Sequence, residues 1–268
     1  MLIGVRVGAS GRRREVGMGV RVEESDSAVV VVMDWPERRN ALGPRESEEV
    51  AAAIGEAGQL ARAAVILTGT GAFCAGGDLR VFADLSARLT PAEIEQDVYG
   101  RVQDMVRALR HCPVPTIAAV DGPAVGLGFD LALACDMRFI GPAGWFRQGW
   151  ARAGLIPGTG GIGLLGRLAP GLSWRLVASQ EKLTPPRCAE LGLGAAATVS
   201  ALAAAKDRAA ELASVDRAVL GHYCRMERDL TWPGEAFFAE TARVQAGLIG
   251  SDRFRELAAN ALAERPVN

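Results

Sequence analysis

The side chains that could carry chemistry in this chain are mostly carboxylates. Its 268 residues include 31 Asp and Glu, but only two histidines (His111 and His222) and five cysteines. No cysteine pair has the close spacing of a zinc site, and neither a His-x-x-x-His nor a Gly-x-Ser-x-Gly motif occurs. A zinc enzyme and a serine hydrolase are therefore disfavoured, and we expect no bound metal. If the chain is an enzyme, we expect its acid and base to be carboxylates.

Three glycine-rich segments offer backbone N–H groups in place of reactive side chains. Glycine lets a backbone approach a ligand closely, and the start of a helix leaves its first N–H groups unpaired. The first two segments each follow an apolar run. Two such donors converging on one carbonyl would form an oxyanion hole for thioester chemistry, whereas tight turns are the plainer alternative. The three segments are residues 71–79, 121–130 and 157–163.

The third segment matches the dinucleotide-binding pattern Gly-x-Gly-x-x-Gly from Gly158 to Gly163, with the acidic Glu181 farther along. That pattern must follow a strand, and residues 152–157, which end in a proline, make a poor one. An NAD-dependent oxidoreductase is therefore an alternative that rests on this loop alone.

Hydrophobic patterning predicts the elements that must position these segments. Continuous apolar runs predict buried parallel strands, and apolar residues three and four apart predict helices. The two types alternate through the first 150 residues and helices follow, so we expect an α/β core with a helical C-terminal part. The predicted strands are 20–33 (as one or two), 63–67, 115–120 and 137–140; the predicted helices are 44–62, 91–109, 131–135, 162–168, 173–179, 185–191, 201–213, 232–249 and 251–263.

The first eighteen residues carry three consecutive arginines and little apolar content, and no hydrophobic segment follows them. We expect a disordered tail over residues 1–18 rather than a signal peptide, with Met18 as an alternative start. We expect the core to span residues 19–200 and the helical region residues 201–268.

Composition also limits the partners. A formal net charge of −1 provides no field to hold a polyanion, so we expect no nucleic-acid partner. No run of eighteen apolar residues occurs, so we expect no membrane span. An odd number of cysteines in apolar surroundings indicates reduced thiols in a cytoplasmic protein; these are Cys74, Cys112, Cys135, Cys188 and Cys224.

Five motifs, taken in order, resemble the crotonase (enoyl-CoA hydratase/isomerase) superfamily over about residues 20–265. The resemblance implies a ββα superhelix with a helical C-terminal trimerisation region, assembled as a trimer or a dimer of trimers. It also implies an acyl-CoA thioester as substrate and no cofactor. The motifs are Arg-Arg-Asn-Ala-Leu (38–42), Ala-Phe-Cys-Ala-Gly-Gly-Asp-Leu (72–79), Asp-Gly-x-Ala-x-Gly-x-Gly (121–128), Leu-Ala-x-Ala-Cys-Asp-x-Arg (131–138) and Gly-x-x-Pro-Gly-x-Gly-Gly (154–161).

The resemblance also implies roles for individual residues. The backbone N–H groups of Gly77 and Leu127 would bind the thioester oxygen, with leucine in place of a more usual glycine. Backbone near Ala75, Asp78 and Leu79 would hold the adenine and pantetheine. Arg39 would approach the phosphates, with a solvated surface charge as the alternative. The residues expected to contact substrate are Arg39, Ala41, Ala75, Gly76, Asp78, Leu79, Gly126, Gly128 and Trp150.

This chain departs from the family's pattern at one of its two catalytic carboxylates. Hydratases of the family carry a glutamate three residues after the second oxyanion donor and another twenty residues later; here these positions are Asp130 and Trp150. Asp130 could act as acid or base, or simply favour a helix N-terminus. Trp150 cannot take a proton, and it could wall an acyl pocket or be a core aromatic. The dehalogenase branch has a tryptophan there too, but its aspartate eight residues later is Gly158.

Together these residues predict an acyl-CoA enzyme in which Gly77 and Leu127 stabilise a thioester enolate and Asp130 is the acid or base. Hydration of, or elimination to, an enoyl-CoA is the expected reaction. A C–C hydrolase, decarboxylase or isomerase acting on a bulkier acyl-CoA remains open, as does a non-catalytic acyl-CoA-binding protein that has lost the second carboxylate. We expect Asp121 and Asp136 to be turn and capping groups.

Overall fold

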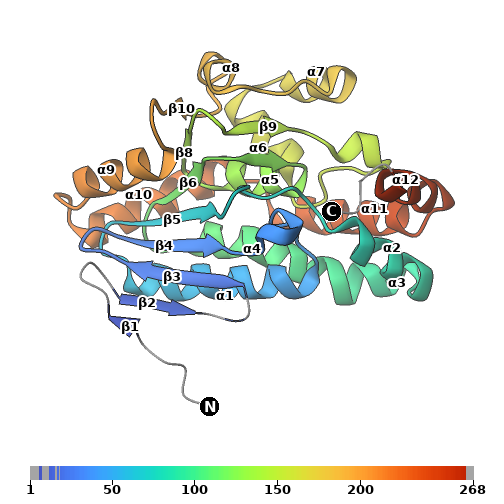
Figure 1. Cartoon of the computed structure of the whole chain (residues 1–268), viewed down its shortest axis with the longest axis horizontal. Helices are drawn as coiled ribbons and strands as arrows, with labels where there is room; N and C mark the ends of the chain where they lie inside the picture. The colour runs from blue at the N-terminus through green and yellow to red at the C-terminus, as the bar shows by residue number, and fades with distance from the viewer. Residues whose placement is uncertain (1–5, 8–11, 16, 18, 264–268) are drawn as a thin grey trace.

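The chain folds as an α/β protein around one large mixed sheet (Figure 1). The computed structural model describes residues 6–7, 12–15, 17 and 19–263. Strands β1 to β4 pair antiparallel, and β4, β5, β6, β8 and β10 then follow side by side as parallel neighbours. A second, parallel pair joins β7 to β9. The strands are β1 (Arg6–Val7), β2 (Arg12–Glu15), β3 (Val20–Glu24), β4 (Ala28–Met33), β5 (Ala64–Gly69), β6 (Thr116–Val120), β7 (Pro123–Val125), β8 (Met137–Ile140), β9 (Trp145–Arg147) and β10 (Ala195–Ala196).

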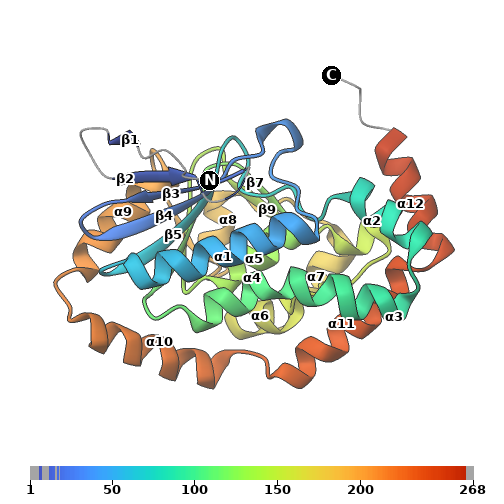
Figure 2. The same ribbon diagram turned by 90° about the horizontal axis from the view of Figure 1, so that it is seen from below.

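Helices cover the sheet and extend beyond one end of it, and α10 and α11 run along one edge of the molecule (Figure 2). Short segments of other helical type interrupt them: η1 (Pro36–Arg38) and η3 (Trp150–Ala153) are 3-10 turns, and η2 (Ile94–Tyr99) is a π-helix. The helices are α1 (Pro44–Leu60), α2 (Leu79–Arg88), α3 (Pro91–Glu93), α4 (Gly100–His111), α5 (Leu127–Ala134), α6 (Gly161–Leu168), α7 (Leu172–Ser179), α8 (Pro185–Glu190), α9 (Ala201–Leu212), α10 (Arg217–Thr231), α11 (Glu235–Ile249) and α12 (Asp252–Ala263).

The continuous apolar runs of the strands reflect a sheet that is buried on both faces. All six residues of β4 are buried. Alternate side chains such as Val31 share a cluster with Ile54 of α1, whereas Val30 lies in a second cluster with Ala205 of α9. Because successive side chains in a strand point to opposite faces, such a strand shows no polar alternation. The predicted α/β core with parallel buried strands is confirmed.

The structure differs from the sequence-based expectation at the N-terminus. Strands β1 and β2 lie within residues 1–18, where we expected a disordered tail, and β2 pairs with the edge of β3. An edge strand presents unpaired N–H and C=O groups that an additional strand can satisfy. Arg14 adds ion pairs with Glu24 and Glu56. Met18 and the remainder of this segment lie outside the described residues, and the division at residue 200 stays a prediction.

Several elements were not predicted, most notably α2 and α10. The single helix expected over residues 91–109 is a continuous helical stretch from Pro91 to His111, in which the middle six residues are π-helical. Helix α5 begins at Leu127, four residues before the expected start, so Asp130 falls in its first turn. None of the helices in the described part of the chain is long and apolar enough to cross a membrane.

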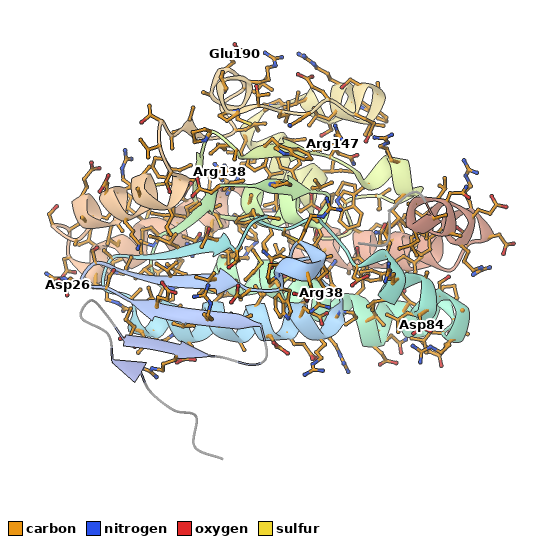
Figure 3. All side chains as sticks on the ribbon, viewed as in Figure 1. Asp26, Arg38, Asp84, Arg138, Arg147 and Glu190 are labelled. Carbon is orange, nitrogen blue, oxygen red and sulfur yellow. The ribbon has the colours of Figure 1, made fainter. Side chains whose placement is uncertain are left out.

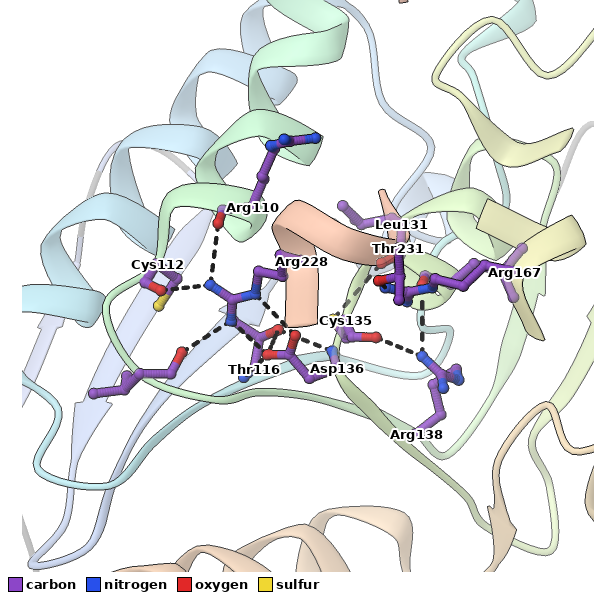
Figure 4. Close-up of polar contacts among 12 residues, drawn as sticks. Arg110, Cys112, Thr116, Leu131, Cys135, Asp136, Arg138, Arg167, Arg228 and Thr231 are labelled. Atoms are coloured by element: carbon purple, nitrogen blue, oxygen red, sulfur yellow. Dashed lines mark hydrogen bonds and ion pairs between the residues drawn. The ribbon is translucent and has the colours of Figure 1, made fainter. Parts of the chain in front are cut away.

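A buried ion pair fastens α10 to the sheet (Figure 4). Arg228 is 2% exposed and donates to both carboxylate oxygens of Asp136, which follows α5. The same guanidinium also donates to the backbone oxygens of Arg110, Cys112 and Val114. Asp136 is therefore the charge partner of a buried arginine rather than the simple turn group we expected. Asp121 does act as a cap, because its carboxylate accepts hydrogen bonds from the N–H groups of Ala201 and Leu202 at the start of α9.

Candidate active site

The first two glycine segments lie side by side at the carboxyl ends of β5 and β6. The N–H of Cys74 donates to the oxygen of Pro123 (3.0 Å), and the N–H of Val125 donates to the oxygen of Cys74 (3.0 Å). Two glycines permit this approach: a Cβ on Gly122 or on Gly128 would lie 2.2 Å from a backbone oxygen of the facing segment. The segments therefore converge, which the sequence alone could not show.

Convergence brings two unpaired backbone donors to one cavity of about 160 Å³, which we call the front cavity. Gly77 and Leu127 both border it, and neither N–H donates a hydrogen bond within the described residues. The N–H of Leu127 is unpaired because this residue begins α5. Its side chain is fully buried, so leucine can occupy this position while presenting only its backbone to the cavity.

Most of the predicted substrate-contacting residues border this front cavity, and some do not. Ala75, Gly76, Leu79, Gly126 and Trp150 line it together with the two donors. Sequence reasoning missed further lining residues, of which only Phe82 had a local signal, since it lies three residues after Leu79 on the same face of α2. The missed residues are Phe82, Val125, Gly149, Ala153, Leu155 and Phe254.

Arg39, Ala41, Asp78 and Gly128 lie near the front cavity without bordering it. The backbone oxygen of Arg39 accepts a hydrogen bond from Ala75, and no hydrogen bond or ion pair of its guanidinium is found in the described part of the chain. Ala41 is buried, and the carboxylate of Asp78 caps α2 by accepting from Arg80 and Val81. Gly128 packs against Cys74.

Positions 130 and 150 are in direct contact. The Trp150 indole N–H donates to Oδ2 of Asp130 (2.9 Å), and the Thr159 hydroxyl donates to the same oxygen (2.7 Å). Burial raises the pKa of the Asp130 carboxyl from its ordinary value of 3.8 to about 7, and these two hydrogen bonds oppose the rise. At neutral pH this carboxyl therefore exchanges readily between its neutral and ionised forms.

Asp130 does not border the front cavity. It lines a second cavity of about 350 Å³ among α5, α6 and α7, which we call the rear cavity. Trp150, held between the positive-φ residues Gly149 and Gly154, borders the front cavity and bonds to Asp130 through its N–H. The third glycine segment contacts Asp130 through Thr159 and Gly161. It follows η3 rather than a strand, so it is not placed as a dinucleotide-binding loop is.

Cys74 lies beside the site but is not a candidate nucleophile. Burial raises the pKa of its thiol to about 12, so the thiol stays neutral near pH 7. Its role is to hold the two loops together through its backbone.

Comparisons with known proteins agree with this fold. The family described as enoyl-CoA hydratase/isomerase matches residues 23–213. A probable enoyl-CoA hydratase of Rhodobacter capsulatus is 34% identical over 254 residues, covering 92% of this chain and 96% of the relative. The probable enoyl-CoA hydratase echA6 of Mycobacterium tuberculosis is 34% identical over 214 residues, covering 78% and 82%.

Solved structures resemble the fold over nearly the whole chain. An enoyl-CoA hydratase/isomerase from Mycobacterium paratuberculosis has a TM-score of 0.81 at 21% identity, covering 92% of this chain and 99% of that one. Pseudomonas aeruginosa OdaA has a TM-score of 0.78 at 26% identity, with coverage of 92% and 99%.

The raised pKa of Asp130 predicts a distinct pH dependence of stability. Between about pH 4 and 7 the native carboxyl is protonated while the unfolded one is ionised, so the native state binds more protons and stability falls as pH rises. As pH rises across this window, we expect the free energy of unfolding of Asp130→Asn to increase relative to that of the wild type by up to about 1.4 kcal/mol per pH unit.

Urea unfolding followed by circular dichroism measures this difference. Asp26→Asn is the matched control, because Asp26 is exposed at the outer edge of the molecule (Figure 3). Parallel stability curves for the wild type and Asp130→Asn between pH 4 and 7 would show that Asp130 is not a perturbed acid.

Proposed function

We propose a function from one premise: the chain belongs to the enoyl-CoA hydratase/isomerase family. The proposal is that it binds an acyl-CoA thioester with the carbonyl oxygen between the N–H groups of Gly77 and Leu127, and that it hydrates an enoyl-CoA or catalyses the reverse elimination. The observation that carries this is the pair of unpaired backbone donors on one cavity. Fixed donors aimed at a developing oxyanion are worth most where water is excluded.

The proposed reaction uses one carboxyl group twice. Asp130 as a carboxylate removes a proton from water while the water oxygen bonds to the β-carbon. The electron pair of the double bond then moves into the thioester as an enolate, whose oxygen is held by Gly77 and Leu127. Asp130 finally returns the proton to the α-carbon. A pKa of about 7 suits a group that must both take and give a proton near neutral pH.

Arg39 is proposed to bind the phosphates of the CoA group. Its guanidinium has no hydrogen-bond or ion-pair partner within the described residues, and its backbone lies against the Ala75 loop at the front cavity. Its neighbour Arg38, in contrast, is engaged by Glu46 and stacks on Trp35. A single local cation suits a chain whose formal net charge is only −1.

A non-catalytic acyl-CoA-binding protein is the second candidate, favoured by the contact of Trp150 with Asp130. In this arrangement the indole borders the front cavity while the carboxyl does not, so the proposed chemistry requires the ring to leave its place. A panel of CoA thioesters followed by mass spectrometry separates the candidates. Mass gain by water indicates hydration, and loss of part of the acyl group indicates C–C cleavage. A bound thioester whose mass and enoyl-thioester absorbance both stay unchanged indicates the second candidate.

The oxyanion hole can be tested at Leu127, because proline removes the backbone donor and is tolerated at the first residue of a helix. We expect Leu127→Pro to lower kcat about 100-fold or more on whichever thioester is turned over. Leu127→Ala, which loses more side chain but keeps the N–H, is the matched control and should retain most activity. Equal loss in both variants would assign the effect to packing and remove this donor from the mechanism.

The role of Asp130 is tested by Asp130→Asn, which can still accept hydrogen bonds from Trp150 and Thr159. We expect kcat to fall about 100-fold or more while the dissociation constant of the CoA ester changes less than about threefold. Steady-state kinetics and direct titration measure the two quantities, with Asp26→Asn as the control. An active Asp130→Asn enzyme would leave Asp130 without a catalytic role.

Self-association through α10 is also proposed, as a trimer or a dimer of trimers. Val219, Tyr223, Met226 and Leu230 repeat at intervals of four, three and four along this helix, and all four are exposed, with Leu230 at 85%. Such a stripe is the seam of a helix that packs against another helix. Its position along the edge of the molecule leaves that side open (Figure 2).

A charge placed in this stripe should prevent self-association. We expect Tyr223→Asp to reduce the mass found by analytical ultracentrifugation to that of one chain, because a carboxylate cannot be buried in an apolar seam without a partner. Ala210→Asp, at an exposed position of α9, is the matched control. A wild-type chain that sediments as a monomer, or an unchanged assembly of Tyr223→Asp, would contradict the proposed interface.

A further inference from the structure

The rear cavity has the size and lining of a ligand site. Its volume of about 350 Å³ lies within the usual range of small-molecule pockets, roughly 300–1,000 Å³, whereas the front cavity at about 160 Å³ does not. Apolar side chains such as Phe129, Leu133 and Leu165 form most of its wall. Its polar side chains are those of Asp130, Gln148 and Ser173.

One oxygen of Asp130 is available to this cavity. Oδ2 is occupied by Trp150 and Thr159, and within the described residues no donor bonds to Oδ1. Oδ1 lies against Gly161, which also lines the rear cavity: a Cβ on Gly161 would be only 2.1 Å from Oδ1. No Lys or Arg side chain of the described residues pairs with this carboxyl, although Asp130 is only 2% exposed. A buried acceptor with a vacant oxygen therefore forms part of an otherwise apolar wall.

The mouth of the rear cavity opens between α6 and α7. Trp174 of α7 lines the cavity and is 80% exposed, and Ile162 of α6 and Val177 of α7 are exposed beside it. A large aromatic side chain at such a position can cover an apolar ligand. A molecule can enter here without passing through the front cavity.

The two cavities meet at η3 and the residues that follow it. Trp150 and Ala153 face the front cavity, Ala151 faces the rear cavity, and Leu155 borders both. Hydrogen bonds of Trp150 to Asp130 and of Leu155 to the Trp150 oxygen hold this partition in place. Among the residues that the structure describes, Asp130 is thus the one whose titratable side chain both bonds to Trp150 and lines the rear cavity.

We propose that the rear cavity is a second binding chamber, which takes an uncharged, mainly apolar molecule about the size of a substituted six-membered ring and anchors it by one hydrogen bond to Oδ1 of Asp130. An anion is rejected because the carboxylate is buried without a cation. Trp150 divides this chamber from the front cavity, and the chamber shares Asp130 with the proposed reaction. Its ligand can bind in the absence of any CoA ester.

Benzamide and benzoate are suitable probes, because they share a shape and differ in charge. At pH 8, above the pKa of about 7 of Asp130, the carboxyl is mostly ionised and can accept from the amide N–H of benzamide. We expect benzamide to bind at least about tenfold more tightly than benzoate, as measured by ligand-observed NMR titration without CoA. In Asp130→Asn this preference should shrink to less than about threefold, because the repelling charge is gone.

Variants of α7 locate the probe. Ser173 lines the cavity, and Ser173→Phe should fill it and weaken benzamide binding at least about tenfold. Ala178 is exposed on the same helix and lies outside the cavity lining, so Ala178→Phe should bind benzamide as the wild type does.

Three results would overturn the proposal: no binding of benzamide, equal binding of benzamide and benzoate to the wild-type chain, or no effect of Ser173→Phe. Absence of binding together with a change of assembly mass in Ser173→Phe would assign this face to a second copy of the chain instead. Acyl-CoA turnover is measured separately at the front cavity, so its failure leaves the benzamide result intact, and the converse also holds.

Discussion

Two backbone hydrogen bonds, joining Cys74 to Pro123 and to Val125, are the contact on which the site depends. They continue the parallel pairing of β5 and β6 beyond the main sheet, so the two loops that follow these strands lie side by side. The glycines at 122 and 128 follow from this closeness, because any side chain would strike the facing backbone. The N–H of Leu127 stays unpaired because this residue begins a helix, and the N–H of Gly77 stays unpaired because its neighbour Leu42 bonds to Gly76 and Asp78 on either side of it.

A second constraint is that the carboxyl of Asp130 both bonds to Trp150 and lines the rear cavity. Oδ2 of Asp130 is taken by the indole N–H of Trp150, where the family resemblance led us to expect a glutamate, and by the Thr159 hydroxyl. Neutral donors stabilise the ionised form less than a cation does, so burial dominates and keeps the proton affinity high. With tryptophan rather than a carboxylate at position 150, the site holds a single acid supported by neutral donors, and the indole also forms the wall between the cavities.

Hydrophobic patterning in the sequence predicted most of the strands and several of the helices. The strands from Val20 to Met33 were evident because burial on both sheet faces leaves a continuous apolar run, and the helix after Pro44 was evident because burial of one face leaves apolar residues at helical spacing. Motif position also indicated that residues 130 and 150 belong together. Phe254 could not be predicted as a wall of the front cavity, because it reaches the site only through the packing of α12, and the tilt of that helix is set by tertiary contacts. Helix α10 was missed because its exposed face carries apolar side chains such as Leu230 and its buried face carries Arg228 beside apolar residues, which obscures the usual amphipathic pattern.

The pairing of Arg228 with Asp136 has a consequence for the order in which this protein is built. The two residues are 92 positions apart, so Asp136 leaves the ribosome roughly 5 to 20 s before Arg228 does, at synthesis rates of about 5–20 residues per second. During that interval the Asp136 carboxylate can accept hydrogen bonds from Thr116 but has no Arg228 to neutralise it. The central strands can pair in this time, whereas the contact of α10 with Asp136 forms only after residue 228 has been made.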